Sequence, residues 1–568
     1  MSISFHTNSS LPNVSSLAPT QRGAVDQTAA RPPQPPPQRA QTLDERRTEG
    51  WRQRVRFMQQ LLLSDAGKTE AHADAQVIQE LREHRFAATT RLLMQENSPF
   101  LDTVINAFAE FKEEMRKQQP GEKDFKKCEK RLIEMLAGHL PAEGKGQKAI
   151  DKNAKAKAKT KTLYKQAVVD HLNAQQWEPI NETFAYKGSS YTSHLTPASR
   201  IKLGDHNVFK EDYQGKGVAS GSTTCTNHAT NLWISEFTAK NASSAKATPL
   251  FRGIRHGILS PYGVKGKTER RAGAENRARE VVTAALFLDQ KKLQAALAGN
   301  TVDLKLTSTS LVTAFNFRNQ TEGKQISDQI KAWDKLSSEQ PCTLQIRDAD
   351  GSLKTVKINL QVAAFNVGVN EAALNMKVGW GPSDQQNEKA LRTLLGDDLS
   401  TKSGWVGEYL ASQPEPGNAK VVRGLSAQIR QIWNDQSHHS DGGEPYKLAQ
   451  RIALLSHEIG VVPCYNCKSG KDRTGMLDSE LKREAVQLHS GGSLSTPAAK
   501  LTSEQQGMFR KVLANSGNLG IQKVNTGAPG NKVLKKLSAI GNNLSLRARI
   551  GSEEVFDKIR GASGAVKS

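Results

Sequence analysis

Residues 461–488, VVPCYNCKSGKDRTGMLDSELKREAVQL, constrain the fold of this chain more than any other segment. Val461 and Val462 are typical of a short buried strand. After them, apolar residues recur at the spacing of a helix, at Leu477, Leu481, Ala485 and Leu488. The segment CKSGKDRT, residues 467–474, therefore lies between a strand end and a helix start, and we expect a mixed α/β domain around it.

Cys467 and Arg473 have the spacing of cysteine, five residues and arginine that is typical of cysteine-dependent phosphatases. Backbone N–H groups in such a loop converge on an anion, and the start of the helix adds positive potential. The same field lowers the pKa of a cysteine and favours its thiolate. We expect Cys467 to attack phosphorus, Arg473 to hold two phosphoryl oxygens, and Thr474 to donate a hydrogen bond to the thiolate.

The residues between the cysteine and the arginine are expected to bind the substrate. They are Lys468, Ser469, Gly470, Lys471 and Asp472. Two ammonium groups on the rim of the loop fit a ring that bears several phosphates better than a single phosphotyrosine. Solvation of the loop by these lysines is the alternative, and Asp472 has the alternative of capping loop amides or the helix N-terminus.

Net charge and composition narrow the classes of partner. The net charge of +22 over 568 residues favours polyanions. Nucleic acid is not expected, because no zinc-finger spacing and no recognisable nucleic-acid module occurs in the sequence. Five sparse cysteines argue against a disulfide-built scaffold. No stretch reaches the roughly 18 apolar residues of a spanning helix, so contact with an anionic membrane is expected to be peripheral.

Three regions are expected along the chain. Residues 1–42 are rich in Ser, Asn, Thr, Gln and Pro and are expected to be a disordered tail, with an export signal as the sharper alternative. Residues 43–178 have helical periodicity and are expected to form an α-helical N-terminal domain for partner or membrane binding. Within it, the lysine-rich stretch 145–165 fits a solvated linker or an anionic-lipid patch. Residues 179–568 are expected to form the α/β phosphatase domain.

Several elements of that domain are readable from periodicity and turn signals. Strands are expected at 250–259, 302–313, 342–348 and 353–360, and helices at 273–288 and 445–459. Asp350-Gly351 predicts a hairpin turn between the last two strands. Gly460 is expected to end the second helix.

The segment CKSGKDRTGM and the upstream FNVGVN, residues 365–370, resemble the paired motifs of the SopB/SigD/IpgD inositol phosphate phosphatases. The likeness extends through GIRHGILSPY, DGGEPYKLAQR and NSGNLGIQKVNTGAPGNKV and covers the chain from about residue 165 to its end. The two motifs also resemble those of the mammalian inositol polyphosphate 4-phosphatases. The resemblance implies a phosphatase for phosphoinositide lipids and soluble inositol polyphosphates that needs no metal and no cofactor.

The same resemblance implies a setting for the protein. It implies a virulence effector that a bacterial type III system secretes into the host cell, where it acts in the cytoplasm and on membrane surfaces. It also implies a Rho-family GTPase and a secretion chaperone as partners of the N-terminal region. That region matches the family poorly, so these partners are expectations from the family alone.

Four further residues are expected to contact the substrate. Asn366 and Asn370, in FNVGVN, can orient the loop or bind inositol hydroxyls through their amides, with a strand-to-turn role as the alternative. Lys532 and Lys535 resemble a C-terminal basic element of the family and are expected to contact phosphate or membrane. A solvated helix start is the alternative for these two lysines.

Asp441 is the preferred general acid for the leaving inositol oxygen. Phosphatases of this type place an aspartate about thirty residues before the cysteine, and both Asp435 and Asp441 lie in that range. Asp441 is preferred because its neighbouring glycines allow the loop to move and because DGGEP belongs to the family-like segment. Helix capping is the alternative role of Asp441.

The sequence also allows two alternative functions for the protein and two interpretations of Cys464. A protein tyrosine or dual-specificity phosphatase is the runner-up enzyme, and a GTPase-binding adaptor is the alternative from another class. Cys464, three residues before Cys467, is expected to be an inert buried strand residue, with a protective Cys464–Cys467 disulfide as the alternative.

Overall fold

The computed structural model describes residues 168–241, 246–314, 322–369, 381–412, 416–534 and 544–561, together with 130, 162, 165 and 166. The expected tail, 1–42, and almost all of the expected helical domain, 43–178, lie outside the described residues. Residues 168–174 are helical. The first strand begins at Ile180, close to the expected start of the α/β domain at residue 179.

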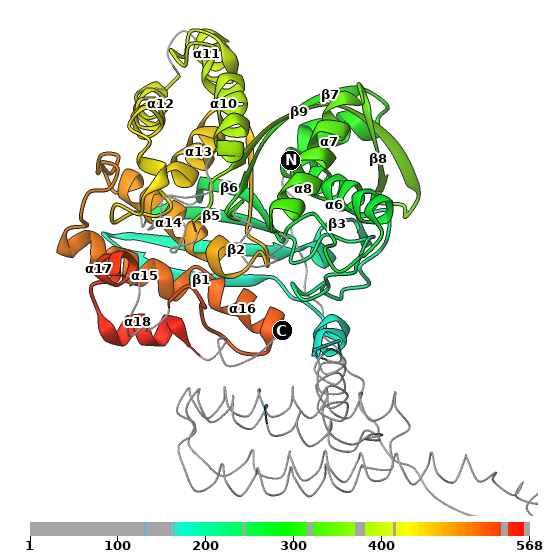
Figure 1. Ribbon diagram of the computed structural model, residues 1–568, viewed down its shortest axis with the longest axis horizontal. Helices are drawn as coiled ribbons and strands as arrows, with labels where there is room; N and C mark the ends of the chain where they lie inside the picture. Colours follow the sequence, from blue (N-terminus) through cyan, green and yellow to red (C-terminus); the bar gives the residue numbers. More distant parts are fainter. Residues whose placement is uncertain are drawn as a thin grey trace, which may run out of the picture. The chain divides into compact units, whose positions relative to one another are not determined.

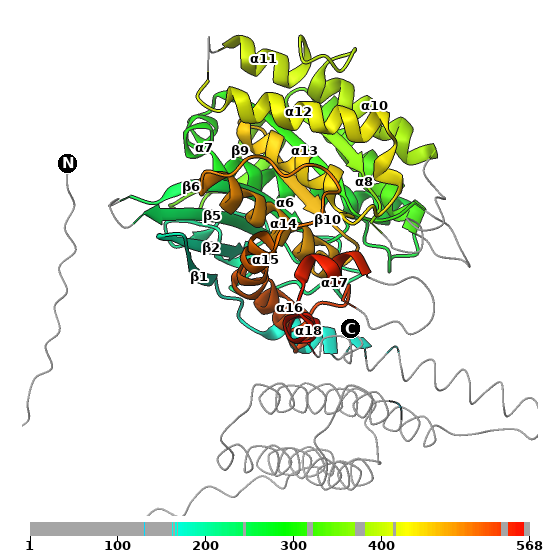
Figure 2. The ribbon, with the colours of Figure 1, turned by 90° about the vertical axis from the view of Figure 1, so that its left-hand side faces the viewer.

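The centre of the described structure is an eight-stranded sheet with the order β1-β2-β5-β6-β10-β7-β9-β8. Its strands are β1 (Ile180–Tyr186), β2 (Ser189–Pro197), β5 (Trp233–Asn241), β6 (Thr248–His256), β7 (Thr301–Ser310), β8 (Cys342–Arg347), β9 (Leu353–Asn366) and β10 (Val462–Asn466). Neighbouring strands in the order β1-β2-β5-β6 are antiparallel, and β8 is antiparallel to β9. Figure 2 shows β1, β2, β5 and β6 side by side at this edge of the sheet. The four strands β6, β10, β7 and β9 are parallel. A separate hairpin pairs β3 (Lys202–Leu203) with β4 (His206–Asn207).

Helices cover both faces of this sheet, and each face has its own apolar core (Figure 1). One core receives side chains from α6 (Lys267–Leu288), α7 (Gln290–Leu297) and α8 (Glu322–Ser338). The other receives them from α10 (Gly381–Leu395), α11 (Gly404–Ser412), α12 (Ala419–Asn434), α13 (Lys447–Glu458), α14 (Asp472–His489), α15 (Ser503–Asn515), α17 (Leu544–Ile550) and α18 (Glu553–Arg560). The described residues also include α16 (Asn518–Thr526) and the short 3-10 turns η1 (Ala198–Arg200) and η2 (Ser437–His439).

The sequence-predicted elements that lie among the described residues are confirmed, with shifted ends. The expected strands correspond to β6, β7, β8 and β9, and the expected helices to α6 and α13. β8 and β9 form the hairpin predicted from Asp350-Gly351, where Gly351 has a φ of +82°. Leu448, Ile452 and Leu455 of α13 are buried, and Gly460, with a φ of +72°, follows the end of that helix.

β10 begins at Val462, the second of the two valines that indicate it in the sequence, and continues through Pro463 to Asn466. A proline lacks the N–H that a central strand must donate. β10 tolerates it because pairing with β6 starts only at Cys464, one residue later. The side chains then alternate between the faces, so Cys464 lies in one core, while Tyr465 and Cys467 lie in the other.

The carboxyl ends of the four parallel strands meet at one edge of the sheet. Asn466 is paired in register with His256 of β6 and with Ser310 of β7, and Ser310 is paired with Asn366 of β9. Ligands bind characteristically at this edge in sheets with parallel strands. The edge brings together CKSGKDRT, GIRHGIL and FNVGVN, three segments that are far apart in the sequence.

Among the described helices, none combines the length and the apolar character that a membrane-spanning helix requires.

Candidate active site

The loop between β10 and α14 is held through its carbonyl groups. The N–H of Ile258 donates to the carbonyl of Lys468 at 3.2 Å, and Nδ2 of Asn231 donates to the carbonyl of Ser469 at 3.1 Å. These two bonds fix the backbone of the loop 467–471, which lies between a strand end and a helix start, where anions commonly bind.

Gly470 is the point where the loop comes closest to β6. Its φ of +67° is in the left-handed region that favours glycine. A Cβ atom at this position would lie 2.5 Å from the carbonyl oxygen of His256. Both the backbone conformation and the close approach therefore require glycine, and the role of Gly470 is to shape the loop.

Cys467 is buried at the end of β10, with 1% of its surface exposed. Its N–H donates to Oγ1 of Thr474 at 2.8 Å, so the Thr474 hydroxyl proton is available to the thiolate. Burial by itself raises the pKa of the Cys467 thiol, but the charge of Arg473 and hydrogen bonds from the side chain and backbone of Thr474 outweigh it, and the pKa lies below the usual value. The site therefore favours a thiolate at Cys467.

Arg473 is partly buried at the first turn of α14. Its Nη1 donates to the carbonyl oxygen of Leu311, the first residue after β7, at 2.9 Å. This bond uses one of the five N–H donors of the guanidinium group. The bond to Leu311 thus anchors Arg473 on the segment after β7. The other N–H donors of the planar guanidinium group can hold an anion.

The two loop lysines differ in their surroundings. Lys468 is partly exposed, and its ammonium group lies 4.6 Å from the centre of the Tyr262 ring. The Lys471 side chain is only 4% exposed, and its Nζ lies 2.6 Å from Oδ2 of Asp472. The expectation of two ammonium groups on the rim therefore fits Lys468, whereas Lys471 is buried and paired in this structure.

Asp472 links the loop to the C-terminal part of the domain. Its Oδ1 accepts a hydrogen bond from the N–H of Lys532 at 3.0 Å, and its carbonyl accepts one from Nδ2 of Asn531 at 3.0 Å. Burial raises the pKa of Asp472, but Lys471 and the bond from Lys532 lower it below its usual value. Lys532 is thus placed beside the loop, while Lys535 lies outside the described residues.

Asn366 is buried at the end of β9, and its amide bonds to protein groups. Its Nδ2 donates to the carbonyl of Val312 at 2.8 Å, and its Oδ1 accepts from Oγ of Ser383 at 2.6 Å. Its backbone also exchanges hydrogen bonds with the side chain of Asn387. These contacts favour the orienting role over binding of inositol hydroxyls. Asn370, the other asparagine of the motif, lies outside the described residues.

Asp441 lies in the turn that leads into α13. Its Oδ1 accepts the N–H of Gly443 at 2.9 Å, an arrangement that closes an Asx turn, and its carbonyl accepts from Nζ of Lys447 at 2.9 Å. Gly442 and Gly443 both have positive φ values, a conformation that glycine adopts without steric cost. Asp435 caps the end of α12 instead.

Three residues that touch the loop were not singled out by sequence analysis: Asn231, Tyr262 and Leu311. Asn231 has a φ of +51°, a conformation that asparagine tolerates better than most residues, but this is not readable from the sequence. Tyr262 is the last residue of the family-like segment GIRHGILSPY, and this resemblance is the sequence feature that could have identified it as a site residue. Leu311 contributes a backbone carbonyl, for which no side-chain pattern exists.

Cys464 faces away from Cys467. It lies in the core on the opposite side of the sheet, where burial raises the pKa of its thiol. A strand holds side chains on opposite faces too far apart for a disulfide without backbone movement. The interpretation of Cys464 as a buried packing residue is the one that agrees with the structure.

The sheet, its helical layers and the loop at its parallel edge define the class of protein by fold. The fold is similar to that of the solved structure of SidF, a Legionella phosphoinositide phosphatase, with a TM-score of 0.54 over 84% of this chain and 90% of that chain at 13% sequence identity. A second solved structure, of a Legionella phosphoinositide phosphatase studied for substrate recognition, has a TM-score of 0.53 over 85% and 91% of the two chains at 12% identity. At this level of identity the likeness concerns the fold alone.

Sequence comparison defines the family. Residues 43–566 match the family described as enterobacterial virulence protein IpgD. Inositol phosphate phosphatase SopB of Salmonella typhimurium is 45% identical over 484 residues, 84% of each chain. Inositol phosphate phosphatase IpgD of Shigella flexneri is 42% identical over 418 residues, 72% of this chain and 76% of that chain. The chain therefore belongs to the IpgD family, and the resemblance noted in the sequence is confirmed.

Proposed function

We propose that this protein is an inositol phosphate and phosphoinositide phosphatase that works through a phosphocysteine at Cys467. The observation that carries the proposal is a buried cysteine at the end of a parallel strand, whose pKa is lowered by Arg473 and Thr474. Its relatives at 42% to 45% identity are named inositol phosphate phosphatases, which supports the substrate class.

In the first step, the Cys467 thiolate attacks phosphorus, an S–P bond forms, and the bond from phosphorus to the inositol oxygen breaks. Arg473, anchored on Leu311, holds two equatorial oxygens, and the loop N–H groups hold the anion as charge develops. Asp441 gives the proton to the leaving oxygen. In the second step, water attacks phosphorus and gives one proton to the Asp441 carboxylate, a new P–O bond forms as the S–P bond breaks, and inorganic phosphate leaves. The Thr474 hydroxyl stabilises the departing thiolate.

Substrate choice is assigned to the charges around the loop. Lys468 binds a second phosphate on an inositol ring in this proposal, and its partial exposure beside the Tyr262 ring supports that role. Lys471 and Lys532 flank Asp472 and add positive potential behind the loop. The same proposal includes the domain limits 1–42, 43–178 and 179–568. It also includes action in a host cell after type III secretion, with a Rho-family GTPase and a secretion chaperone as partners. Family membership supports these parts of the proposal.

The test is phosphate release by the full chain from vesicles that contain phosphoinositides, from soluble inositol polyphosphates and from phosphotyrosine peptides. Cys467→Ser should abolish release, and Arg473→Ala should reduce it by about a hundredfold to a thousandfold, as loss of an electrostatic stabiliser does. Rapid acid quench with phosphorus-labelled substrate should leave the label on the peptide that contains Cys467.

Cys464→Ala is the matched control, because this cysteine is on the same strand but in the opposite core. It should keep both the activity and the labelled peptide. Label that persists in Cys467→Ser would contradict the phosphocysteine, and faster release from phosphotyrosine peptides than from all inositol substrates would favour the tyrosine phosphatase alternative.

A further inference from the structure

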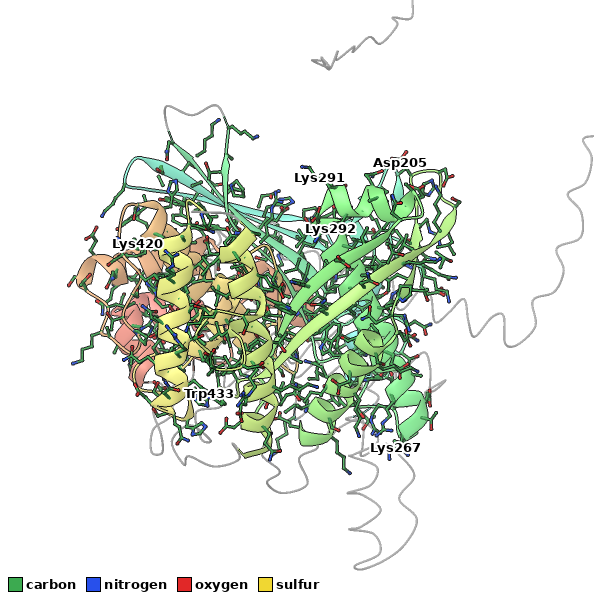
Figure 3. All side chains as sticks on the ribbon, turned by 90° about the horizontal axis from the view of Figure 1, so that it is seen from above. Asp205, Lys267, Lys291, Lys292, Lys420 and Trp433 are labelled. Carbon is green, nitrogen blue, oxygen red and sulfur yellow. The ribbon has the colours of Figure 1, made fainter. Side chains whose placement is uncertain are left out.

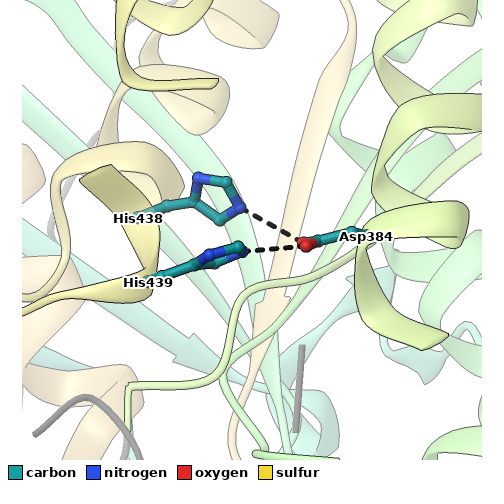
Figure 4. A group of neighbouring side chains, drawn as sticks. All are labelled: Asp384, His438 and His439. Atoms are coloured by element: carbon teal, nitrogen blue, oxygen red, sulfur yellow. Dashed lines mark hydrogen bonds and ion pairs between the residues drawn. The ribbon is translucent and has the colours of Figure 1, made fainter. Parts of the chain in front are cut away.

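A group of two histidines and one aspartate lies between α10 and the turn that follows α12, and it plays no part in the proposed phosphatase chemistry. His438 and His439 belong to η2, and Asp384 is in the first turn of α10. Figure 3 labels Trp433 at the end of α12 that leads into this turn. In Figure 4 the three side chains point toward one another from the two segments.

The distances place the two imidazoles on the two oxygens of one carboxylate. Nε2 of His438 is 3.2 Å from Oδ1 of Asp384, and Nε2 of His439 is 2.8 Å from Oδ2. Candidate ligand atoms of the three residues all lie within 4.8 Å of one another. A tetrahedral ion with bonds of about 2.0–2.1 Å separates its ligand atoms by about 3.3 Å, so small side-chain adjustments suffice to surround one.

The histidine rings are held in place for this task. The His438 ring stacks on the Trp433 ring, with centroids 4.9 Å apart and planes at 16°, and its side chain is only 2% exposed. The His439 ring lies against it at 4.1 Å. Asp384 is in the first turn of α10, so its carboxylate lies at the N-terminal end of that helix. Because the histidine rings are packed against Trp433 and against each other, the three ligands need little reorganisation.

The second nitrogen of His438 supplies an independent argument. Its Nδ1 faces the carbonyl oxygen of Ile432 at 3.4 Å, while its Nε2 faces the carboxylate. Both partners are hydrogen-bond acceptors, and a neutral imidazole has only one N–H to give. In either tautomer, one ring nitrogen therefore points its lone pair at an oxygen. Either a second proton or a metal cation at Nε2 removes the conflict, and with a metal bound Nδ1–H donates to the carbonyl, as in most histidines that bind a metal.

We propose that Asp384, His438 and His439 bind one Zn²⁺ ion, with a fourth position open to water. Two imidazoles and a carboxylate match the ligand preferences of zinc. His439 and Asp384 are 17% and 26% exposed, so an ion can enter from solvent. The ion joins the start of α10 to the turn before Asp441. It therefore acts as a clip that fixes this turn and is not a participant in phosphate transfer.

The test measures zinc binding to the full chain in a Cys467→Ser background, so that the reactive thiolate cannot compete for the ion. After removal of metal with a chelator, isothermal titration and elemental analysis should find one equivalent of Zn²⁺ that stays bound through gel filtration. Zinc should raise the melting temperature, because it binds the folded state. Co²⁺ in the same site should give the visible bands of a four-coordinate ion.

Asp384→Asn and His439→Gln should each weaken this equivalent at least as much as loss of an outer partner does, by about tenfold to a hundredfold. His228→Gln is the matched control, because His228 is 19% exposed and is paired with one carboxylate, Glu280, at 2.8 Å. It should leave zinc binding unchanged.

Equal zinc affinity in Asp384→Asn and in the parent would overturn the proposal, as would the absence of binding in the parent. If Asp384→Asn lowers the melting temperature of a parent that binds no zinc, the cluster is a protonated histidine–carboxylate clip and the metal site is wrong. None of these outcomes depends on whether the protein releases phosphate.

Discussion

The reactivity proposed for Cys467 depends on the side chain seven residues later. Thr474 accepts the N–H of Cys467 at 2.8 Å, which leaves its own hydroxyl proton free to bond to sulfur. Burial opposes ionisation of the thiol, so the hydrogen bonds from Thr474 and the charge of Arg473 are what lower its pKa. Removal of either the Thr474 hydroxyl or the Arg473 charge should therefore raise the pKa of the Cys467 thiol.

We predict that Thr474→Val shifts the pH midpoint for alkylation of Cys467 upward, because the thiolate loses a donor while the cost of burial remains. Phosphate release should fall by roughly tenfold to a hundredfold, the equivalent of one hydrogen bond to a charged group. The rate of iodoacetamide reaction at Cys467, followed by peptide mass spectrometry across pH, is the measurement.

Thr283→Val on α6 is the control for the loss of a buried threonine hydroxyl, since Thr283 bonds to the carbonyl of Arg279 within its own helix. It should leave the Cys467 midpoint in place. An unchanged midpoint in Thr474→Val would mean that Arg473 and the loop backbone alone set the reactivity of the cysteine.

At the scale of elements, the site depends on how three parallel strand ends are joined to one another. Asn366 at the end of β9 bonds to the carbonyl of Val312, and the preceding carbonyl, that of Leu311, anchors Arg473. Leu311 N–H also donates to the carbonyl of Asn466 at 2.7 Å, which ties β7 to β10. Asn366 therefore acts on the arginine through the backbone after β7.

We predict that Asn366→Ala lowers both stability and catalysis. It leaves the carbonyl of Val312 and the hydroxyl of Ser383 without their bonds inside the core, at a cost of roughly 2 kcal/mol in the free energy of unfolding. A shifted Leu311 should lower kcat more than it raises KM, because the arginine is needed most in the transition state. Urea unfolding and steady-state kinetics are the measurements.

Asn359→Ala is a matched control on the same strand, where the amide makes an exposed bond to Asp303. Its effect on stability should stay within about 0.5 kcal/mol, with unchanged kinetics. A larger rise in KM than fall in kcat for Asn366→Ala would instead favour direct contact between this amide and the substrate.

At the scale of the whole molecule, a buried network of charges fastens the C-terminal helices to the helix of the active site. Glu480 of α14 accepts two hydrogen bonds from Arg549 of α17, at 2.8 and 2.9 Å, and one from Arg483 at 2.9 Å. Burial raises the pKa of Glu480, but the two arginines outweigh it and lower the pKa to about 2. The charge of Glu480 is therefore tied to the folded state.

We predict that Glu480→Gln destabilises the protein at pH 7 by roughly 3 to 5 kcal/mol, because two buried arginines each lose one of their carboxylate partners. In the wild type this contribution is present above the unfolded pKa of 4.5 and is lost as pH falls toward the folded pKa of about 2. The difference between variant and wild type should therefore shrink as pH is lowered below 4.5. Chemical unfolding at a series of pH values is the measurement.

Glu388→Gln provides the comparison, since Glu388 is half exposed and pairs with Arg392 on the surface of α10. Its effect should stay within about 0.5 kcal/mol at every pH. A deficit in Glu480→Gln that does not change with pH would show that shape, and not charge, sets the contribution of this side chain.

The sequence alone determined features that depend on neighbours along the chain. Periodicity and turn chemistry act over a few residues. They predicted the strand, loop and helix around Cys467, the hairpin at Asp350-Gly351 and the end of α13 at Gly460. The spacing of Cys467 and Arg473 is local in the same sense, and with the family motifs it identified the family.

The tertiary structure alone decided which distant residues meet. The bond from Asn366 to Val312 spans 54 residues, that from Arg549 to Glu480 spans 69, and Asp384 lies 55 residues before His439. No histidine spacing in the sequence indicates a metal site, because the carboxylate comes from another helix. Sequence analysis predicted Cys464 as a strand residue and so a strand that includes Pro463, but only the pairing shows why the proline is tolerated, because β6 begins to pair one residue later. Such contacts depend on packing between elements, and periodicity within one element carries no information about its partner.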